Sequence, residues 1–393
     1  YALVRVALSC RGSIMWEMQA GMGDAVFTPF YKVLKKRGVK FEFFSKVKAL
    51  HLDDEGRRIE SITVARQAEL AEGRESYDPL VPVHELECWP SAPLWDQLQD
   101  GASYRDQGIN FEEWCSPELY EYPLEAGRHF DQVVLGISLG AFPYVCAELI
   151  DARPEWAAMV ENIATVRTQA TQLWFKQPAE ELGWKEDSLS ASCYDTTNFD
   201  VWYDFSHLID RESWPKGEGT GPECLSYLNG TMLQEGAQRG KKESCEELDQ
   251  RAQNDRIKAL AVEFLRNQSF RIFSNEATEG SFNWDVLIDD RDVPGEGEDR
   301  IDAQYFRANV QPTERYVQSL PSTAQYRLHP GDSKFDNLYL AGDWTWNSFN
   351  AGCVESATIS GMLAANGMCG SPPLKRIVGL TFGYPHSPYR KGS

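Results

Sequence analysis

Two short segments near the end of the chain decide the fold. Residues 337–345 read N-L-Y-L-A-G-D-W-T, and residues 352–365 read G-C-V-E-S-A-T-I-S-G-M-L-A-A. This order predicts an apolar strand that ends at Gly342-Asp343, and a helix that begins after Gly352. A strand-end glycine lets a ligand approach the backbone, and free amides at a helix start favour negative charge. The segments therefore fit a cofactor with a polyol chain, or a plain strand–turn–helix packed with small residues.

Composition and charge exclude several classes of protein. The chain has 393 residues, 42% hydrophobic and 25% charged, which is typical of a globular protein with one or two domains. Its 39 basic and 59 acidic residues give a net charge of −20. The long-range field of such a chain repels nucleic acid and anionic membrane surfaces. No stretch approaches the ~18 apolar residues of a membrane span, so only peripheral membrane contact stays open.

The nine cysteines and six histidines follow no recognisable pattern. They include no C-x-x-C pair and no H-E-x-x-H motif. We therefore expect neither a disulfide framework nor a metal site, and a reducing, cytoplasmic compartment. The chain begins with Tyr1 and shows no signal-peptide pattern, and we expect an N-terminal portion to be missing.

The N-terminal part predicts a helix followed by a small antiparallel sheet. Residues 24–37 have the period of an amphipathic helix with Asp24 as its cap. The apolar residues of this helix share one face: Val26, Phe27, Phe30, Val33 and Leu34. Three short strands are predicted after it, at residues 39–44, 46–52 and 58–64. Residues 68–127 have no sustained period and predict an irregular excursion.

The middle of the chain is less regular. Residues 130–137 predict a buried strand, and residues 246–267 a charged helix. The side chains of residues 165–175 follow the two-residue period of a β-strand, but neither face of this strand is purely apolar. This pattern fits a strand that lines a cavity, or an ordinary half-exposed strand. A glycine cluster at residues 217–221 predicts a linker, and residues 284–300 predict a loop.

The two segments quoted first resemble the C-terminal flavin-binding signature of the FAD-dependent amine oxidase and phytoene desaturase superfamily, and are closer to its desaturase-like branch. Residues 20–47, with A-G-M-G-D, a helix and R-G, resemble the family's GGM helix and the strand that meets adenine. Residues 130–141 resemble the strand that returns to the FAD domain. The resemblance implies an α/β fold: an FAD/NAD(P)-binding Rossmann-like domain with a second, mixed α+β substrate domain.

The resemblance also implies that this chain is a C-terminal fragment. The family's N-terminal βαβ unit, with its G-x-G-x-x-G turn, is absent from these residues. The implied FAD-binding domain is discontinuous. The implied parts are 1–68 (FAD-binding, helix and β-meander), 69–126 (irregular excursion), 127–150 (FAD-binding strand and helix), 151–330 (substrate domain), 331–370 (C-terminal FAD motif) and 371–393 (tail).

Carried onto this sequence, the resemblance implies five FAD contacts. Asp343 would bond the ribityl or pyrophosphate part of FAD, with Gly342 allowing its close approach. The amide of Val354 would point at the pyrimidine end of the isoalloxazine, and Gly352 would free that helix terminus. Val47 would cap the adenine through its backbone. No catalytic acid or base follows from the sequence.

The implied reaction is hydride removal by FAD from a lipophilic, desaturase-like substrate or from an amine. Oxygen, a quinone or another acceptor would then reoxidise the flavin. Cys353 stands where amine-oxidising relatives commonly carry an aromatic residue, which favours the lipophilic substrate. Trp344, Trp346 and Phe349 would either form an apolar substrate wall or serve as packing. Two alternatives remain open: a non-catalytic scaffold that retains the flavoprotein fold, and a different nucleotide-binding enzyme.

Overall fold

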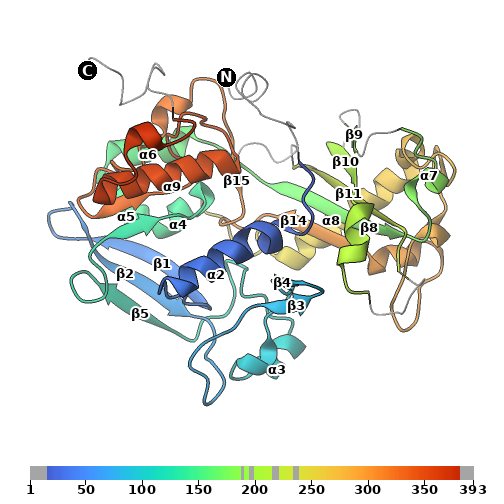
Figure 1. Cartoon of the computed structure of the whole chain (residues 1–393), viewed down its shortest axis with the longest axis horizontal. Coiled ribbons are helices and arrows are strands. Elements are labelled where there is room, and N and C mark those ends of the chain that lie inside the picture. Colours follow the sequence, from blue (N-terminus) through green and yellow to red (C-terminus); the bar gives the residue numbers. More distant parts are fainter. Residues whose placement is uncertain (1–15, 187–189, 194–198, 215–220, 233–238, 381–393) are drawn as a thin grey trace.

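Two hydrophobic cores organise the molecule. The computed structural model describes residues 16–186, 190–193, 199–214, 221–232 and 239–380. The first core draws on residues between 50 and 163 and between 328 and 344, whereas the second lies between 173 and 310. Figure 1 shows the elements around these cores side by side, with β1, β2 and α9 in one half and β8 to β11 in the other. Gly217 and Gly219 of the glycine cluster lie outside the described residues.

An antiparallel sheet covers one side of the first core. Its central strand pairs with both neighbours, and Val47 is opposite Val64. The strand predicted at residues 39–44 is absent, because the chain turns there with Phe44 at a φ of 53°. The third strand comes instead from the segment predicted to be irregular. In sheet order the strands are β1 (Ser45–Leu52), β2 (Ile59–Arg66) and β5 (Tyr120–Glu125).

A short parallel pair joins segments that are far apart in the sequence. β6 (Val133–Leu135) pairs with β16 (Leu338–Leu340), and α9 (Val354–Cys369) packs against β16. The strand and helix predicted from residues 337–365 are confirmed, whereas the strand predicted at 130–137 is shorter. Parallel strands require a long crossover connection, which here contains the whole second core.

The second core is built on a five-stranded antiparallel sheet with α8 (Gln250–Asn267) on one face. Leu173 and Phe175 lie in this core with Phe264 of α8. Asp249 caps α8 by accepting a hydrogen bond from the amide of Ala252 at 2.7 Å. In sheet order the strands are β14 (Tyr305–Asn309), β8 (Thr168–Phe175), β11 (Cys224–Thr231), β10 (Val201–Asp204) and β9 (Ser190–Ser192).

Three consecutive helices complete the first core. The boundary predicted at residue 151 assigns the last of them to the substrate domain, but Trp156 and Met159 of this helix pack with Leu135 and Leu340. The division between the cores therefore falls closer to residue 164. The helices are α4 (Phe142–Val145), α5 (Ala147–Ala152) and α6 (Pro154–Asn162).

Short elements fill the remaining segments. Several lie in residues 69–126, which were predicted to be irregular, and two 3-10 helices lie in the predicted loop 284–300 and its continuation. The short strands are β3 (Val81–Val83), β4 (Leu86–Cys88), β7 (Thr165–Val166), β12 (Ala277–Thr278), β13 (Ser281–Phe282) and β15 (Tyr316–Val317). The short helices are η2 (Trp95–Gln97), α3 (Gly101–Asp106), α7 (Ala179–Leu182), η4 (Ser206–Arg211), η6 (Ser269–Arg271), η7 (Trp284–Val286), η8 (Gly297–Ala303), η9 (Ala324–Tyr326) and η10 (Leu374–Arg376).

The helix predicted at residues 24–37 forms, but its apolar face is not buried. A π-helical turn, η1 (Gly23–Phe27), leads into α2 (Thr28–Lys36). Only Thr28 and Tyr31 of α2 are buried. Of the predicted apolar face, Val26 is partly buried, and the exposed residues are Phe27, Phe30, Val33 and Leu34. Asp24 does not cap the helix, because its carboxylate accepts a hydrogen bond from the amide of Trp89 at 2.8 Å.

The sequence predicted no disulfide framework, but the structure contains a disulfide. Cys115 and Cys245 form a disulfide that joins positions 130 residues apart, with a Cα–Cα distance of 5.7 Å. Both cysteines are exposed. The cysteines therefore give no support to the reducing, cytoplasmic compartment that we expected. Within the described residues, no helix is long and apolar enough to cross a bilayer.

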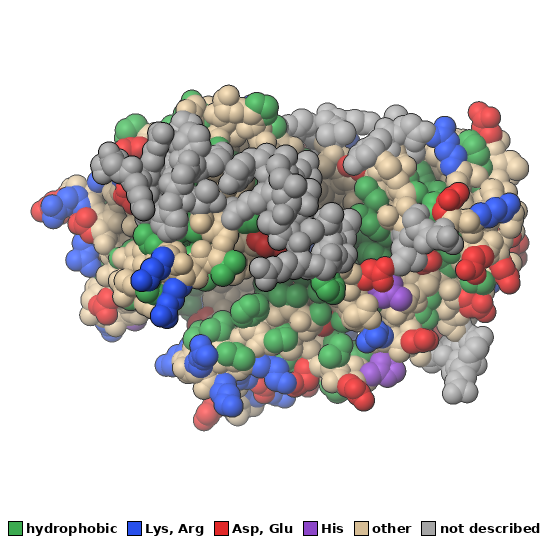
Figure 2. All heavy atoms as spheres, turned by 45° about the horizontal axis from the view of Figure 1, so that its top comes forward, with side chains coloured by type: hydrophobic (Ala, Val, Ile, Leu, Met, Phe, Trp, Pro, Cys, Tyr) green, Lys and Arg blue, Asp and Glu red, His purple; other side chains and the backbone are tan. Residues whose placement is uncertain are grey.

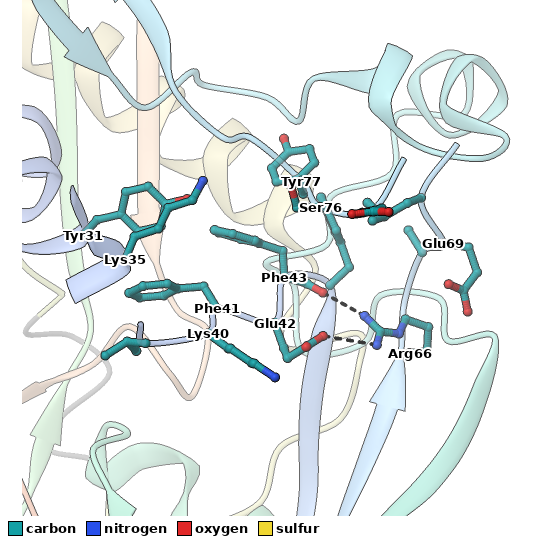
Figure 3. Close-up of a pocket in the computed structure, with 15 residues that line it drawn as sticks. Tyr31, Lys35, Lys40, Phe41, Glu42, Phe43, Arg66, Glu69, Ser76 and Tyr77 are labelled. Atoms are coloured by element: carbon teal, nitrogen blue, oxygen red, sulfur yellow. Dashed lines mark hydrogen bonds and ion pairs between the residues drawn. The ribbon is translucent and has the colours of Figure 1, made fainter. Parts of the chain in front are cut away.

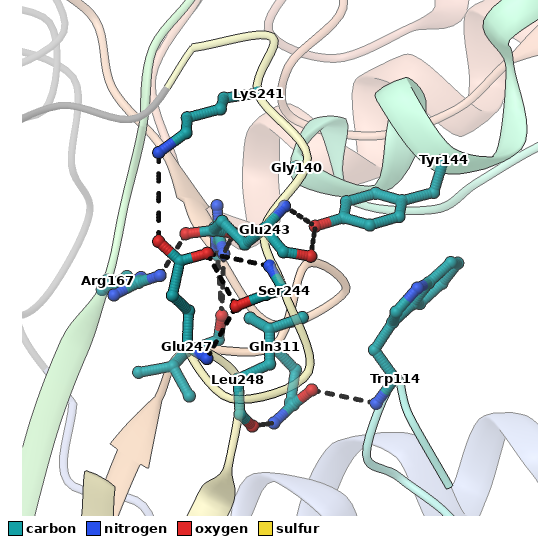
Figure 4. A network of polar contacts seen from close by, with 12 residues as sticks. Trp114, Gly140, Tyr144, Arg167, Lys241, Glu243, Ser244, Glu247, Leu248 and Gln311 are labelled. Atoms are coloured by element: carbon teal, nitrogen blue, oxygen red, sulfur yellow. Dashed lines mark hydrogen bonds and ion pairs between the residues drawn. The ribbon is translucent and has the colours of Figure 1, made fainter.

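A buried ion-pair network joins the two cores (Figure 4). The carboxylate of Glu243 accepts hydrogen bonds from Arg167 of the second core and from Arg315. The carbonyl oxygen of Arg315 in turn accepts a hydrogen bond from Ser138 at 2.9 Å. The backbone amide of Glu243 donates to the hydroxyl of Tyr144 at 2.6 Å. These bonds fix the turn after β6, which leads from the parallel pair into α4.

Candidate functional site

The turn after β16 has a conformation that requires glycine. Gly342 has a φ of +149°, and a Cβ atom there would lie 2.3 Å from Nε1 of Trp344. The amide of Gly342 donates to Oγ of Ser360 at 3.0 Å, and the hydroxyl of Thr345 donates to the carbonyl of Gly342 at 2.8 Å. Because Ser360 belongs to α9, this helix holds the turn in place.

Asp343 lies beside the start of α9. Its Oδ2 is 3.5 Å from the position that a Cβ of Gly352 would occupy. Because residue 352 has no side chain, the space beside this oxygen stays open. Burial raises the pKa of the Asp343 carboxyl, while the charge of Arg327 and nearby backbone amides oppose that shift. Arg327 also donates to the carbonyl oxygen of Asp343. The turn thus holds a partly buried carboxylate next to a helix terminus.

The first turn of α9 keeps its backbone amides available. Cys353 occupies the N-cap position, but its side chain makes no capping hydrogen bond and instead donates to Oγ of Ser356 at 3.2 Å. The first intrahelical bond runs from the amide of Ala357 to the carbonyl of Cys353 at 3.1 Å. The backbone amides before Ala357, beginning with Val354, therefore have no acceptor within the helix. The Val354 side chain is exposed. Such a terminus attracts anions and electron-rich oxygens.

The aromatic residues between the turn and the helix pack against two cores. Trp344 is buried in the first core, and its Nε1 donates to the carbonyl of Ile137 at 2.9 Å. Trp346 is buried in a separate, smaller core with α9, and Phe349 packs against that core. Burial of Trp344 and Trp346 favours the packing interpretation for these two residues, whereas Phe349 is only partly buried.

One buried donor near Gly352 has no partner among the described residues. Asn350 is buried, and its Oδ1 accepts a hydrogen bond from the amide of Asn347 at 3.1 Å. Its Nδ2 has no hydrogen-bond partner within the part of the chain that the structure describes. Buried amides of this kind are normally satisfied, so a ligand acceptor at this position would remove an unfavourable feature.

Val47 lines a cavity that includes none of the other four predicted residues. This cavity has a volume of about 300 Å³ and is also lined by Trp114, Ile137 and Ala141. Ile137 also contacts the turn, because its carbonyl oxygen accepts a hydrogen bond from Nε1 of Trp344. The structure brings Gly342, Asp343, Gly352 and Val354 together at the turn and the start of α9, whereas Val47 lines a separate cavity. A further cavity of about 390 Å³ lies beside α2 and contains none of the five residues (Figure 3).

A larger cavity of about 1050 Å³ lies on the sheet of the second core, on the face opposite α8. Gln172 and Trp174 line it, whereas Leu173 and Phe175 point into the core. The cavity-lining interpretation of the strand at residues 165–175 is therefore confirmed. The chain just before η1 covers this face of the sheet, since residues between 16 and 22 line the same cavity.

Aromatic side chains form one wall of this cavity. Phe205 stacks between Tyr203 and Tyr227, with ring centroids 5.7 and 5.2 Å apart. Sequence reasoning missed these residues. A pattern in the sequence could have revealed them. Residues 203 and 205, and residues 225 and 227, are apolar or aromatic at alternate positions, as in a strand with one apolar face.

The cavity contains three acidic residues, and neither Lys nor Arg, among the residues that the structure describes. The acidic residues are Glu17, Asp204 and Glu212. Burial raises the pKa of the Glu212 carboxyl, and the charge of Asp24 adds to this effect. His207 also lines the cavity, and its Nε2 lies 3.1 Å from the carbonyl oxygen of Met18.

Comparison with known proteins identifies the segment that carries the turn. Residues 296–369 match the family model described as flavin containing amine oxidoreductase. The predicted superfamily is confirmed. The flavin-containing amine oxidoreductase segment includes Gly342, Asp343, Gly352 and Val354, but not Val47. The structure is a mixed α/β fold, as expected for this superfamily, although a Rossmann-like domain stays a prediction.

No curated protein matches the sequence. A crystal structure of an oxidoreductase from Methanosarcina mazei shares 11% sequence identity, with a TM-score of 0.38. The match covers 86% of this chain and 52% of that chain, so the chain spans about half the length of the solved structure.

Proposed function

We propose that this chain is the larger part of an FAD-dependent oxidoreductase. The observation that carries the proposal is the placement of the Asp343 carboxylate against Gly352, at an uncapped helix terminus. The matched family is flavin-containing, which supports a flavin. The choice of FAD rests on the sequence resemblance.

The residues at this corner have the chemistry that a flavin needs. The Asp343 carboxylate would accept hydrogen bonds from ribityl hydroxyls, and the amides at Val354 would hold an electron-rich part of the ring. A bound flavin would supply the hydride-accepting chemistry, and the protein binds, orients and tunes it electrostatically. A helix terminus favours the negative charge of a reduced ring by about 1 kcal/mol.

The large cavity is the proposed substrate site. Its aromatic wall, formed by Tyr203, Phe205 and Tyr227, suits a lipophilic body, which supports the desaturase-like reading of the sequence. The carboxylates of Asp204 and Glu212 also suit a positively charged head group. A lipophilic substrate is therefore the first candidate and an amine the second, with oxygen or a quinone as acceptor.

A further strand-bearing unit is proposed to complete the sheet beneath the flavin. Among the described residues the parallel sheet has two strands, and Val134 of β6 is exposed. Parallel sheets are normally wider and are covered on both faces. A dinucleotide-binding βαβ unit beside β6 would cover this surface and add phosphate contacts.

FAD titration of the purified protein tests this proposal. Saturable quenching of flavin fluorescence and visible flavin absorption are expected. Replacing Asp343 with Ala is expected to weaken FAD affinity at least tenfold, whereas the matched variant Asp336→Ala, at an exposed position on the same segment, is expected to leave the affinity unchanged. No flavin binding with FAD in excess, in a folded protein, would favour the non-catalytic scaffold instead.

A further inference from the structure

Helix α2 presents an apolar face to solvent. Phe27 and Phe30 are 55% and 62% exposed, and Val33 and Leu34 are exposed beside them. Figure 2 shows hydrophobic side chains next to basic ones on this part of the surface. A contiguous apolar face of this kind indicates a surface that meets another apolar phase or partner.

The same segment is the basic part of an acidic protein. Residues 25–41 contain no acidic side chain, although the chain carries a net charge of −20. Lys32 pairs with Glu87, and Lys35 pairs with Asp78. The five basic residues of this segment are Lys32, Lys35, Lys36, Arg37 and Lys40. Lys36 and Arg37 are exposed at the end of the helix, directly after the apolar face.

We propose that the α2 surface, formed by Phe27, Phe30, Val33, Leu34 and the pair Lys36-Arg37, docks on an anionic lipid bilayer. An apolar stripe flanked by lysine and arginine is the arrangement with which helices lie in a bilayer interface. Each basic residue near the surface is attracted to anionic headgroups. A neutral protein partner would gain nothing from these charges, so charge complementarity favours the membrane.

The net negative charge of the chain does not prevent this contact. At physiological ionic strength the Debye length is about 8 Å, so charges further from the bilayer are largely screened. At the contact, Glu87 and Asp78 offset the charges of Lys32 and Lys35. Lys36, Arg37 and Lys40 form no ion pair with the described residues, so the surface keeps a local excess of positive charge. The sequence-based expectation that the chain is repelled by anionic membranes therefore holds at long range and not at the α2 surface.

The α2 surface continues into the mouth of the large cavity. Trp16, Met18 and Met22 are exposed, and all three line that cavity. They directly precede η1, which leads into α2. A lipophilic molecule could thus pass from the bilayer to the aromatic wall without crossing water. This last step rests on the proposed function, whereas the docking itself does not.

Vesicle sedimentation tests the charge contribution. The protein is expected to sediment with phosphatidylcholine vesicles that contain about one third phosphatidylglycerol, and not with phosphatidylcholine alone. Binding is expected to fall at about 0.5 M NaCl, where the Debye length is roughly halved. The double variant Lys36→Glu, Arg37→Glu is expected to lose at least tenfold in affinity. The matched exposed pair, Lys375→Glu with Arg376→Glu, is expected to bind like the wild type.

A second pair of variants tests the apolar contribution. Phe27→Ser with Phe30→Ser is expected to weaken binding to the anionic vesicles at least tenfold, whereas Val293→Ser, at another exposed apolar position, leaves it unchanged. Circular dichroism checks that each variant is folded. Equal binding of the charge-reversed variant and the wild type would overturn the proposal. A dimer that Phe27→Ser with Phe30→Ser dissociates, without vesicle binding, would also overturn it and assign the surface to a second copy.

FAD titration in the absence of vesicles keeps the two proposals separate. Vesicle binding without FAD binding would contradict the proposed function alone. FAD binding without vesicle binding would contradict the α2 surface alone.

Discussion

Oδ2 of Asp343 lies 3.5 Å from the position that a Cβ of Gly352 would occupy. This distance is an ordinary van der Waals contact, so alanine fits at residue 352 without distorting the backbone. The methyl group would nevertheless fill the space in front of the carboxylate. We expect Gly352→Ala to change the free energy of unfolding by less than about 0.5 kcal/mol while weakening FAD binding. Chemical denaturation and FAD titration of the same preparation check this, and an unchanged FAD affinity would contradict the proposed site.

Gly342 responds differently, because its φ of +149° and its contact with Trp344 leave no room for a side chain. Gly342→Ala is expected to destabilise the fold by about 2 kcal/mol or more. Gly361→Ala, in the open part of α9 where a Cβ meets nothing within 4 Å, is the matched control. It is expected to be neutral or stabilising by up to about 1 kcal/mol. Urea denaturation distinguishes the two, and similar destabilisation of both would contradict the strained turn.

The carboxyl of Asp343 carries a cost in stability. Because burial raises its pKa in the folded state, the unfolded chain releases this proton at a lower pH. Stability from this group is therefore lost as pH rises through the folded pKa, and is absent at neutral pH. Asp343→Asn is expected to unfold at a higher temperature than the wild type at pH 7, yet to bind FAD more weakly. A lower melting temperature of Asp343→Asn at pH 7 would contradict the assignment.

His329 gives the opposite dependence of stability on pH, because its pKa is lowered in the folded protein. Burial lowers its pKa to about 4, and its ring stacks on Trp346 at 5.9 Å. The unfolded chain therefore binds a proton near pH 6.5 before the folded protein does. Stability from this group is present above about 6.5 and is lost as pH falls towards 4, by about 3 kcal/mol at most. The stability of His329→Gln is expected to depend less on pH over this window, and parallel pH profiles of the two proteins would contradict the prediction.

The Cys115–Cys245 disulfide closes a long loop and joins the Trp114 segment to the segment before α8. Its removal in Cys115→Ser with Cys245→Ser is expected to cost about 2–4 kcal/mol, chiefly because the unfolded chain gains freedom. Cys369→Ser, at an exposed free cysteine, is the control and is expected to be neutral. Denaturation with and without a thiol reductant gives the comparison. A wild type that is equally stable under both conditions would contradict a stabilising disulfide.

The parts of the site that follow from local chemistry were predictable. β16, the turn at Gly342-Asp343 and α9 lie within thirty-odd consecutive residues, and their glycines, small residues and apolar run are visible in the sequence. Residue 47 was predicted on the correct strand, but the cavity that it lines depends on how Trp114 and Ile137 pack beside that strand. No local pattern contains that information, because these two residues come from separate segments.

The sequence by itself determined the strand, the turn and the helix of the flavin signature, since backbone preferences act over a few residues. Only the tertiary structure decided which surfaces are buried. It left the apolar face of α2 exposed, paired Cys115 with Cys245, and directed Gln172 and Trp174 into a cavity. Periodicity shows that a helix or strand has two faces, but burial depends on which distant segment packs against each face.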